Sequence, residues 1–283
     1  MTAQRHPDGP VVVVGSGLAG WSAVREFRKV DTATPVLMIT ADAGDFYAKP
    51  ALSNALVQGK VPAQLVPATG AKAIRVSFMG NATNDVMSVN SLDDYAAFRA
   101  KLKPQARVLI IGAGLIGCEF ANDLAASGHA VQVVDPGASP LASLLPQEAS
   151  HALRESLAAL GVRWHFGTSA SSIDRVKDEN VVTFANGQTV VVDVVLSAVG
   201  LRADTALAQA AGIAAERGIV VNAQLQTTAP HVYALGDNTQ YASESAGVSR
   251  TLPYVMPIMN AAKALAATLK GTPTPLVFPL MLP

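Results

Sequence analysis

The sequence has almost no cysteine, no excess of either charge and no long uninterrupted apolar run. The single cysteine, Cys118, excludes an intramolecular disulfide and a C-x-x-C redox pair. The 21 basic and 21 acidic residues cancel, so charge gives no reason to expect a nucleic-acid or anionic-membrane partner. No apolar stretch reaches the roughly 18 residues that a transmembrane helix needs. The polar first ten residues lack a signal-peptide core, and we therefore expect a cytoplasmic protein.

The 283 residues are sufficient for one large domain or two medium ones, each with a real hydrophobic core. Neither His151 nor His165 has neighbours that suggest a metal site, so no metal is expected.

A glycine-rich turn follows the first apolar run of the chain. Four valines at residues 11–14 are typical of a buried parallel strand, and a helical pattern follows the turn. Gly15, Gly17 and Gly20 have the G-x-G-x-x-G spacing, which suits a tight turn, the approach of a pyrophosphate and close packing of helix on strand. Asp42 stands where an acid that binds ribose is expected.

The same pattern occurs a second time. Residues 107–111 predict a buried strand, and Gly112, Gly114 and Gly117 repeat the spacing before a helix that is expected to end at Gly128. One motif alone is weak evidence, because glycine-rich turns also serve packing. Two complete motifs argue for two dinucleotides held by two domains, as an enzyme that passes electrons from one to the other requires.

Three residues of the second motif are candidates for chemistry. Asp135 closes the next strand with no arginine or lysine nearby, so its carboxylate is expected to bind ribose hydroxyls and to favour NAD over NADP. We expect Glu119 in the first turn of the helix, either close to the cofactor or in a favourable interaction with the helix dipole. Cys118 is expected to be a small buried packing residue and not a catalytic thiol.

Further stretches carry weaker signals. Alternating apolar runs around Asn186 and Gly187 predict a hairpin, and residues 231–237 predict a strand that ends in Gly-Asp. Lys49 is either a solvated surface lysine or a cation beside a cofactor ring, and the sequence alone favours the first interpretation. Ser91 has the spacing of a helix cap after a polar, linker-like stretch at residues 81–90.

Together these motifs resemble the FAD-dependent pyridine nucleotide-disulfide oxidoreductases over nearly the whole chain. The blocks that carry the resemblance are Gly15–Gly20, Met38–Asp42, Tyr47–Pro50, Ala68–Gly70, Gly112–Asp123, Ser197–Gly200, Tyr233–Asp237 and Tyr254–Pro257. The resemblance implies an α/β fold with two Rossmann-like, doubly wound nucleotide-binding domains. It implies an FAD domain formed by residues 1–88 and 218–283, with an NAD domain at residues 89–217 inserted in it.

The resemblance also implies a site. The implied FAD-binding residues are Gly15, Ser16, Gly17, Leu18, Ala19, Gly20, Thr40, Ala41, Lys49, Asp237 and Val255. The implied NADH-binding residues are Gly112, Gly114, Gly117, Glu119, Asp135 and Gly200. Lys49, against the isoalloxazine ring, and Glu119, beside the flavin where nicotinamide stacks, are the expected catalytic residues.

This chain departs from the family in length. Between Gly59 and Ala68 family members have further strands of the FAD domain, including backbone that contacts the adenine. After Pro283 they continue into a domain that covers the flavin and helps to dock the redox partner. The first departure is expected to affect FAD affinity, and the second is expected to affect recognition of the redox partner.

The implied function is transfer of electrons from NADH through FAD to a small iron protein, with rubredoxin or a similar iron electron carrier as the expected partner. The lack of a second cysteine favours this function over disulfide reduction. Two alternatives stay open. One is a ferredoxin reductase of an oxygenase system, and the other is a nucleotide-binding protein without turnover.

Overall fold

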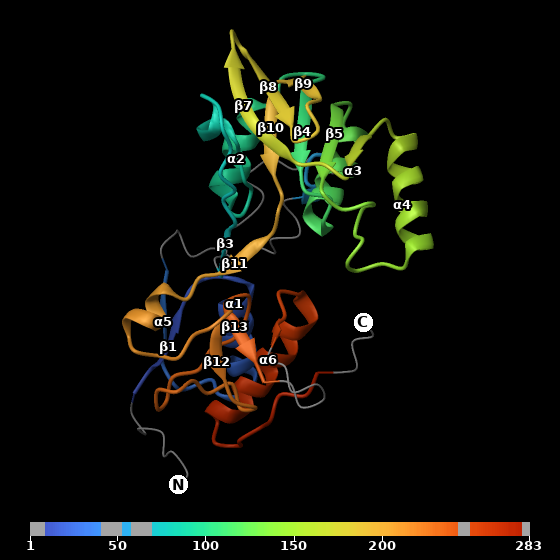
Figure 1. Ribbon diagram of the computed structural model, residues 1–283. Coiled ribbons are helices and arrows are strands. Elements are labelled where there is room, and N and C mark those ends of the chain that lie inside the picture. Colours follow the sequence, from blue (N-terminus) through green and yellow to red (C-terminus); the bar gives the residue numbers. More distant parts are fainter. Residues whose placement is uncertain (1–8, 41–52, 58–69, 243–249, 279–283) are drawn as a thin grey trace. The chain divides into compact units, whose positions relative to one another are not determined.

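The computed structural model describes residues 9–40, 53–57, 70–242 and 250–278 (Figure 1). The chain forms two compact units. The discontinuous unit consists of residues 1–48, 66–72 and 202–283, and the inserted unit of residues 49–65 and 73–201. The chain passes between them at β3 (Ala71–Ala73) and β11 (Leu201–Ala203), which pair with each other.

These crossings come earlier in the chain than the sequence boundaries at residues 88 and 217. The bridges made by residues 79–87 explain why the first boundary lies before residue 88. Met79 bridges to Ser172 and Met87 bridges to Leu196, so residues 79–87 belong to the inserted unit by their hydrogen bonds.

The inserted unit is built on a four-stranded parallel sheet in the order β10-β4-β5-β6, with a three-stranded antiparallel sheet β7-β8-β9. Its helices are η3 (Thr83–Asp85), α2 (Leu92–Lys101), α3 (Leu115–Ala126) and α4 (Gln147–Ala159). Its strands are β4 (Arg107–Ile111), β5 (Ala130–Asp135), β6 (Arg163–Phe166), β7 (Ala170–Val176), β8 (Glu179–Phe184), β9 (Thr189–Val192) and β10 (Val194–Ser197).

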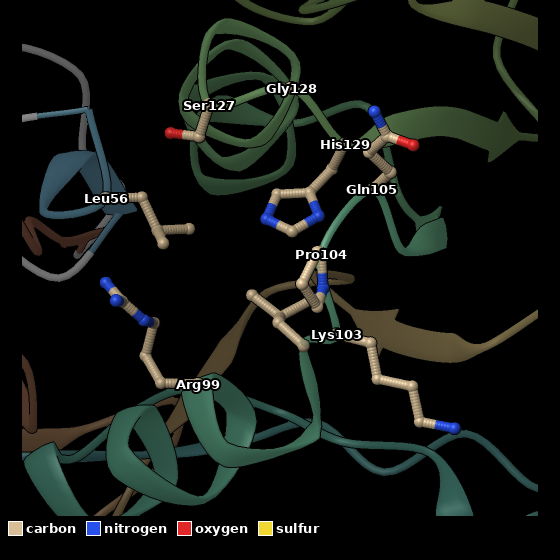
Figure 2. A pocket seen from close by; sticks show the side chains of 9 residues that line it. Leu56, Arg99, Lys103, Pro104, Gln105, Ser127, Gly128 and His129 are labelled. Carbon is tan, nitrogen blue, oxygen red and sulfur yellow. The ribbon is translucent and has the colours of Figure 1, made fainter.

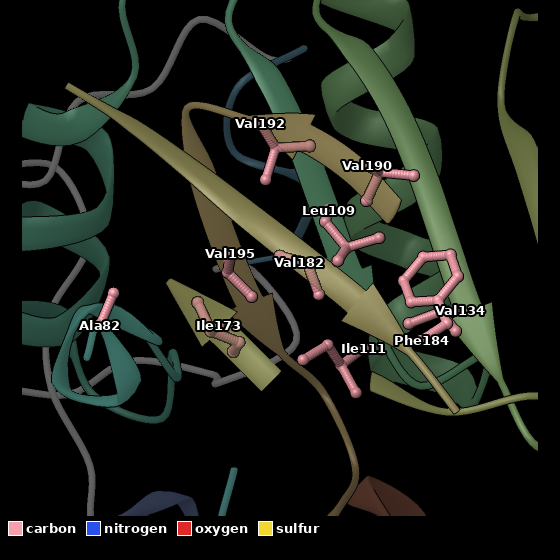
Figure 3. Close-up of a cluster of buried hydrophobic side chains, with 10 residues drawn as sticks. All are labelled: Ala82, Leu109, Ile111, Val134, Ile173, Val182, Phe184, Val190, Val192 and Val195. Atoms are coloured by element: carbon pink, nitrogen blue, oxygen red, sulfur yellow. The ribbon is translucent and has the colours of Figure 1, made fainter. Parts of the chain in front are cut away.

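Apolar side chains fill the space between these two sheets (Figure 3). Leu109 and Ile111 of β4 meet Ile173, Val182 and Phe184 of the antiparallel sheet there. Because side chains alternate along a strand, the other residues of β4 face α3, which packs on β4 and β5. A central parallel sheet covered on both faces is the arrangement that the near-continuous apolar run of β4 predicts.

The helix starts and turns of this unit follow the sequence signals. Ser91 caps α2 in a capping box with Asp94, and β8 and β9 form the hairpin expected around Asn186 and Gly187. Gly128, in the left-handed region at φ 86°, follows the end of α3.

The discontinuous unit contains two small sheets, β1-β2 and β12-β13-β14, with α1 packed on α6. Its core joins Ala23 of α1 to Tyr241 of β13 and Leu265 of α6. Its helices are α1 (Leu18–Val30), α5 (Ala206–Ala210) and α6 (Val255–Leu269). Its strands are β1 (Val11–Val14), β2 (Val36–Ile39), β12 (Ile219–Val221), β13 (Thr239–Tyr241) and β14 (Arg250–Thr251).

The β1-β2 sheet has one open apolar face. Val12, Val14, Leu37 and Ile39 are between 50% and 62% exposed. Parallel strands are normally covered on both faces. The described residues cover only one apolar face of β1 and β2 and leave the other exposed.

The prediction of a strand at residues 231–237 is wrong. The segment makes a single isolated bridge, between Gln226 and Tyr233, and His231 has φ 63°. A positive φ interrupts the extended backbone that a ladder needs.

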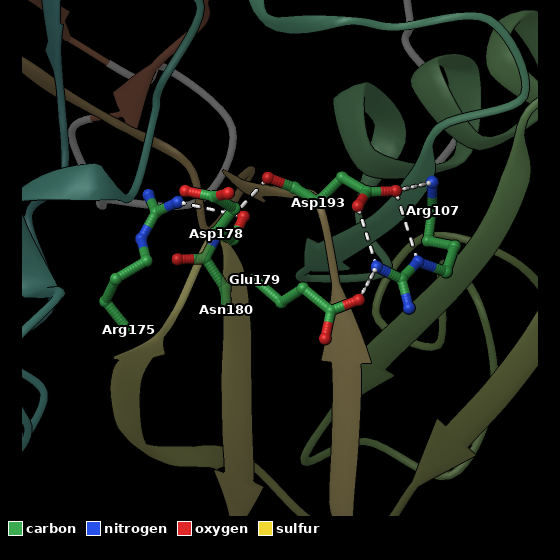
Figure 4. A network of polar contacts seen from close by, with 6 residues as sticks. All are labelled: Arg107, Arg175, Asp178, Glu179, Asn180 and Asp193. Atoms are coloured by element: carbon green, nitrogen blue, oxygen red, sulfur yellow. Dashed lines mark hydrogen bonds and ion pairs between the residues drawn. The ribbon is translucent and has the colours of Figure 1, made fainter.

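Charged side chains tie together three strand ends of the inserted unit (Figure 4). Arg107, the first residue of β4, donates from Nη2 to Asp193 Oδ1 at 2.7 Å and to Glu179 Oε1 at 2.6 Å. Its backbone N–H also donates to Asp193 Oδ2 at 2.7 Å. The hydrogen bond from the Arg107 side chain holds the pKa of Asp193 below its usual value.

We predict that Asp193→Asn lowers the free energy of unfolding by about 1 kcal/mol at pH 7, a modest loss because the pair is partly exposed. Since the folded-state pKa of Asp193 is depressed, its stabilising effect is present above the unfolded-state pKa of about 3.9 and is lost as pH falls through the folded value. The difference between wild type and variant therefore shrinks in acid.

The measurement is urea unfolding at pH 7 and pH 3, followed by Trp164 fluorescence in a Trp21→Phe background so that the signal comes from the inserted unit. Asp178→Asn, in the turn between β7 and β8, is the control and should change little. A difference that stays constant with pH would contradict the assignment.

Candidate functional site

The carboxyl ends of three parallel strands meet at one edge of the inserted unit. Gly112 follows β4, Asp135 ends β5 and Ala198 follows β10. Because β5 lies on one side of β4 and β10 on the other, this edge is the topological switch point, where open α/β sheets bind ligands.

The second glycine motif is a close-packed turn at this edge. A Cβ on Gly117 would lie 2.0 Å from the Gly112 carbonyl oxygen, and a Cβ on Gly112 would lie 2.7 Å from the Ala198 carbonyl oxygen. Gly112 has φ 108°, which favours glycine. A Cβ on Gly114 would meet nothing within 4 Å, so this glycine leaves the backbone open on the outside of the turn.

Asp135 spans the turn from the next strand. It accepts hydrogen bonds from the backbone N–H of Ala113 at 2.7 Å and of Gly137 at 2.6 Å. A carboxylate has about four lone-pair directions, so these two bonds leave it capacity for ribose hydroxyls.

The start of α3 has the features of a phosphate site. Gly114 is the N-cap and makes no side-chain cap, and no acidic residue lies in the first turn. With no N-cap side chain and no acidic residue in its first turn, the start of α3 suits an anion at the positive end of the helix dipole.

The prediction that Glu119 lies in the first turn of α3 is wrong. Glu119 is the fifth residue of α3, counted from Leu115. Because the helix dipole acts mainly within the first turn, it gives Glu119 little support, and the side chain instead accepts a hydrogen bond from the Ser53 hydroxyl.

A second carboxylate of α3 is deeply buried. Asp123 is 0% exposed and accepts hydrogen bonds from the backbone N–H groups of Leu56 and Val57, at 2.9 and 2.7 Å. Burial raises the pKa of Asp123 despite these bonds. No sequence motif indicates the role of Asp123 or that of Ser53. The spacing of Glu119 and Asp123 places both carboxylates on one face of the helix but does not show which segment they bind.

The discontinuous unit repeats the glycine geometry. Gly15 has φ 102°, and a Cβ on Gly20 would lie 2.0 Å from its carbonyl oxygen. The hydroxyls of Ser16 and Thr40 lie 2.9 Å apart, so the structure joins two expected FAD-binding residues from the ends of β1 and β2. Gly17 is the N-cap of α1, again without a side-chain cap.

The turn that carries Asp237 lies against the same helix start. A Cβ on Gly236 would come within 2.7 Å of the Ala19 Cβ, and one on Gly70 would be 3.5 Å from the Asp237 Cβ. The Tyr241 hydroxyl accepts a hydrogen bond from the Gly236 N–H at 2.9 Å, and burial raises the pKa of Tyr241 to about 12. Tyr241 therefore stays protonated and fixes this turn, a role that no sequence motif indicated.

The remaining expected residues fall into two groups. Leu18 and Val255 begin α1 and α6, and Gly200 lies between β10 and β11 with φ 106°. Ala41, Asp42 and Lys49 lie outside the described residues.

Cys118 is a packing residue, as predicted. It is buried, its thiol lies 3.4 Å from the Ala113 carbonyl oxygen, and burial raises its pKa to about 11. A thiol of this kind is not a nucleophile at neutral pH.

A cavity of about 510 Å³ lies at the opposite end of α3 (Figure 2). Arg99, Ser127 and His129 are among its lining residues. Both α2 and α3 end here, so the cavity lies away from the glycine turn and has none of the helix-start N–H groups of α3 that bind a pyrophosphate. This cavity is therefore not the nucleotide site.

Two absences concern only the part of the chain that the structure describes. It contains no group of three or more His, Cys, Asp or Glu residues that could hold a metal ion. It also contains no helix long and apolar enough to cross a membrane.

The paired glycine cradles define a protein of the two-dinucleotide class, and comparison gives its family. A family model described as pyridine nucleotide-disulphide oxidoreductase matches residues 60–264, and this chain belongs to that family. The predicted fold class is thereby confirmed.

Individual relatives are closely similar to the chain. Rubredoxin-NAD(+) reductase from Acinetobacter baylyi is 39% identical over 325 residues, which cover 96% of this chain and 81% of that protein. Nitric oxide reductase FlRd-NAD(+) reductase from Aeromonas hydrophila is 38% identical over 317 residues, with 96% and 80% covered. The crystal structure of a ferredoxin reductase for the CYP199A2 system from Rhodopseudomonas palustris matches with TM-score 0.87 and 25% identity, covering 95% of this chain and 78% of that one.

The alignment with the Acinetobacter protein is longer than this chain, 325 against 283 residues. That relative therefore contains residues with no counterpart here, in agreement with the length departure expected from the sequence.

We predict different outcomes for two glycines of the second motif. Gly117→Ala destabilises the inserted unit by about 1–3 kcal/mol, because its Cβ would collide with the Gly112 carbonyl oxygen. Gly114→Ala folds normally, because its Cβ meets open space, but weakens NADH binding by occupying the outside of the turn.

Unfolding followed by Trp164 fluorescence and NADH titration separate the two effects. Equal stability of both variants, or unimpaired NADH binding by Gly114→Ala, would contradict this division of roles.

Proposed function

We propose that this chain is an NADH-dependent flavoprotein reductase that binds FAD in the discontinuous unit and NADH in the inserted unit. It passes electrons to a small iron protein. The observation that carries the proposal is the pair of glycine cradles, each with the same 2.0 Å close approach and each at an uncapped helix start.

In the discontinuous unit the start of α1, with Gly15, Gly17 and Gly20, would hold the FAD pyrophosphate. The Ser16–Thr40 pair fits an adenosine ribose, and Asp237, held next to α1 by its turn, fits the ribityl hydroxyls. When bound, FAD supplies the change from two-electron transfer with NADH to single-electron transfer with an iron centre.

In the inserted unit Gly112, Gly114 and Gly117 would hold the NADH pyrophosphate. Asp135 would bind the adenosine ribose, and Ala198 and Gly200 would border the nicotinamide half. Glu119 would orient the nicotinamide, while Lys49 would lie beside the isoalloxazine. The protein contributes position and exclusion of water, since the reacting atoms belong to the bound groups.

The acceptor we propose is rubredoxin. The similarity to a rubredoxin-NAD(+) reductase extends over 96% of this chain. The single cysteine supports an iron-protein acceptor over a disulfide. A ferredoxin is the second candidate, because the chain matches a ferredoxin reductase with TM-score 0.87. We propose a cytoplasmic location, where NADH is available.

Anaerobic addition of NADH to the purified protein with FAD tests the whole proposal. We expect flavin absorption that bleaches with NADH, and faster reduction of rubredoxin than of a [2Fe–2S] ferredoxin. Free FAD at the same concentration is the control. A protein that takes up no FAD would overturn the reductase function, and preferential reduction of ferredoxin would replace the acceptor.

The carboxylate of Asp135 predicts a preference for NADH over NADPH. Asp135→Asn removes the charge that repels a 2′-phosphate, and its one amide oxygen can replace only one of the two carboxylate oxygens that accept from the Ala113 and Gly137 N–H groups. We expect the ratio of kcat/KM for NADH to that for NADPH to fall about tenfold, a change equivalent to 1.4 kcal/mol. An unchanged ratio would show that Asp135 only shapes the turn.

A further inference from the structure

Helix α3 binds a separate segment of the chain through two carboxylates. Glu119 and Asp123 are four residues apart and therefore lie on one face of the helix. Residues 53–57 lie on that face, since Ser53 bonds to Glu119 while Leu56 and Val57 bond to Asp123. All these contacts are within the inserted unit.

Asp123 is the anchor of this arrangement. A fully buried carboxylate is costly unless hydrogen bonds satisfy it, and the two backbone N–H groups of Leu56 and Val57 do so. Release of residues 53–57 would leave the buried Asp123 carboxylate without these two hydrogen-bond donors. The segment is therefore held on α3 independently of its first residue.

Ser53 contacts α3 through its side chain, whereas Leu56 and Val57 contact it through their backbone N–H groups. Its side chain is directed to Glu119, and its hydroxyl donates to Oε2 of that carboxylate. Ser53 is only 2% exposed, so water competes little for the bond. Glu119 has three rotatable side-chain bonds and is half-buried, and a buried donor selects one of its conformers.

We propose that Ser53 is a positioning residue that holds the Glu119 carboxylate in the orientation that receives the nicotinamide ring. The inference rests on the proposed NADH site and extends it to a residue that no glycine motif contains. In sequence Ser53 follows Pro50 by three positions, so the stretch with the expected flavin lysine also fixes the carboxylate of the NADH-binding helix.

The test is a double-mutant cycle on binding of NAD+ to the FAD-loaded protein. Ser53→Ala in the wild-type background is expected to weaken NAD+ binding about threefold to tenfold, the net effect of one ordinary hydrogen bond. In the Glu119→Ala background the same change is expected to have no effect, because the group that Ser53 positions is gone. Ser171→Ala removes a comparable hydroxyl, bonded to the Thr183 carbonyl in the same unit, and should leave binding unchanged.

Hydrogen exchange distinguishes positioning from a structural role. Exchange at the Leu56 and Val57 amides is expected to stay slow in Ser53→Ala, since Asp123 still holds them. Fast exchange there would show that Ser53 pins the segment and would overturn the proposal. So would a Ser53→Ala effect that persists in the Glu119→Ala background, or wild-type affinity in Ser53→Ala. A wild-type protein that binds FAD but not NAD+ would overturn the proposed NADH site itself.

Discussion

Both nucleotide cradles depend on one steric condition, the close approach of the third glycine of each motif to the carbonyl oxygen of the first. The distance that a Cβ would have at this point is 2.0 Å in both, for Gly20 against Gly15 and for Gly117 against Gly112. Only a residue without a side chain lets the helix begin so close to the end of its strand. That closeness places the first helical N–H groups at the sheet edge, where an anion can reach them.

The two carboxylates of α3, Asp123 and Glu119, differ in burial and in the groups that donate hydrogen bonds to them. Asp123 is fully buried and satisfied by backbone N–H groups, which makes it part of the packing. Glu119, one turn nearer to the glycine motif, is half-buried and held by a side-chain hydroxyl. In the proposed function this is the carboxylate that orients the nicotinamide.

The two units differ in how completely they cover their parallel strands. In the inserted unit the central parallel strands β4 and β5 are packed on both faces, whereas in the discontinuous unit two parallel strands leave Val12, Val14, Leu37 and Ile39 half exposed. The Acinetobacter relative has residues with no counterpart in this chain. The glycine turn, the Ser16–Thr40 pair and the Asp237 turn are nevertheless formed, because each depends on contacts within its immediate surroundings.

The sequence by itself determined the features that are local. Valine and isoleucine runs specified the strands before each motif, the glycine spacing specified both turns, and Ser91 specified the start of α2, because each signal acts over a few neighbouring residues. Only the tertiary structure decided that Ser53 meets Glu119, that Asp123 satisfies Leu56 and Val57, that Tyr241 holds Gly236 and that residues 231–237 form no strand. These contacts join residues whose pairing depends on how whole elements pack, and packing of distant elements leaves no periodic or spaced pattern in the chain.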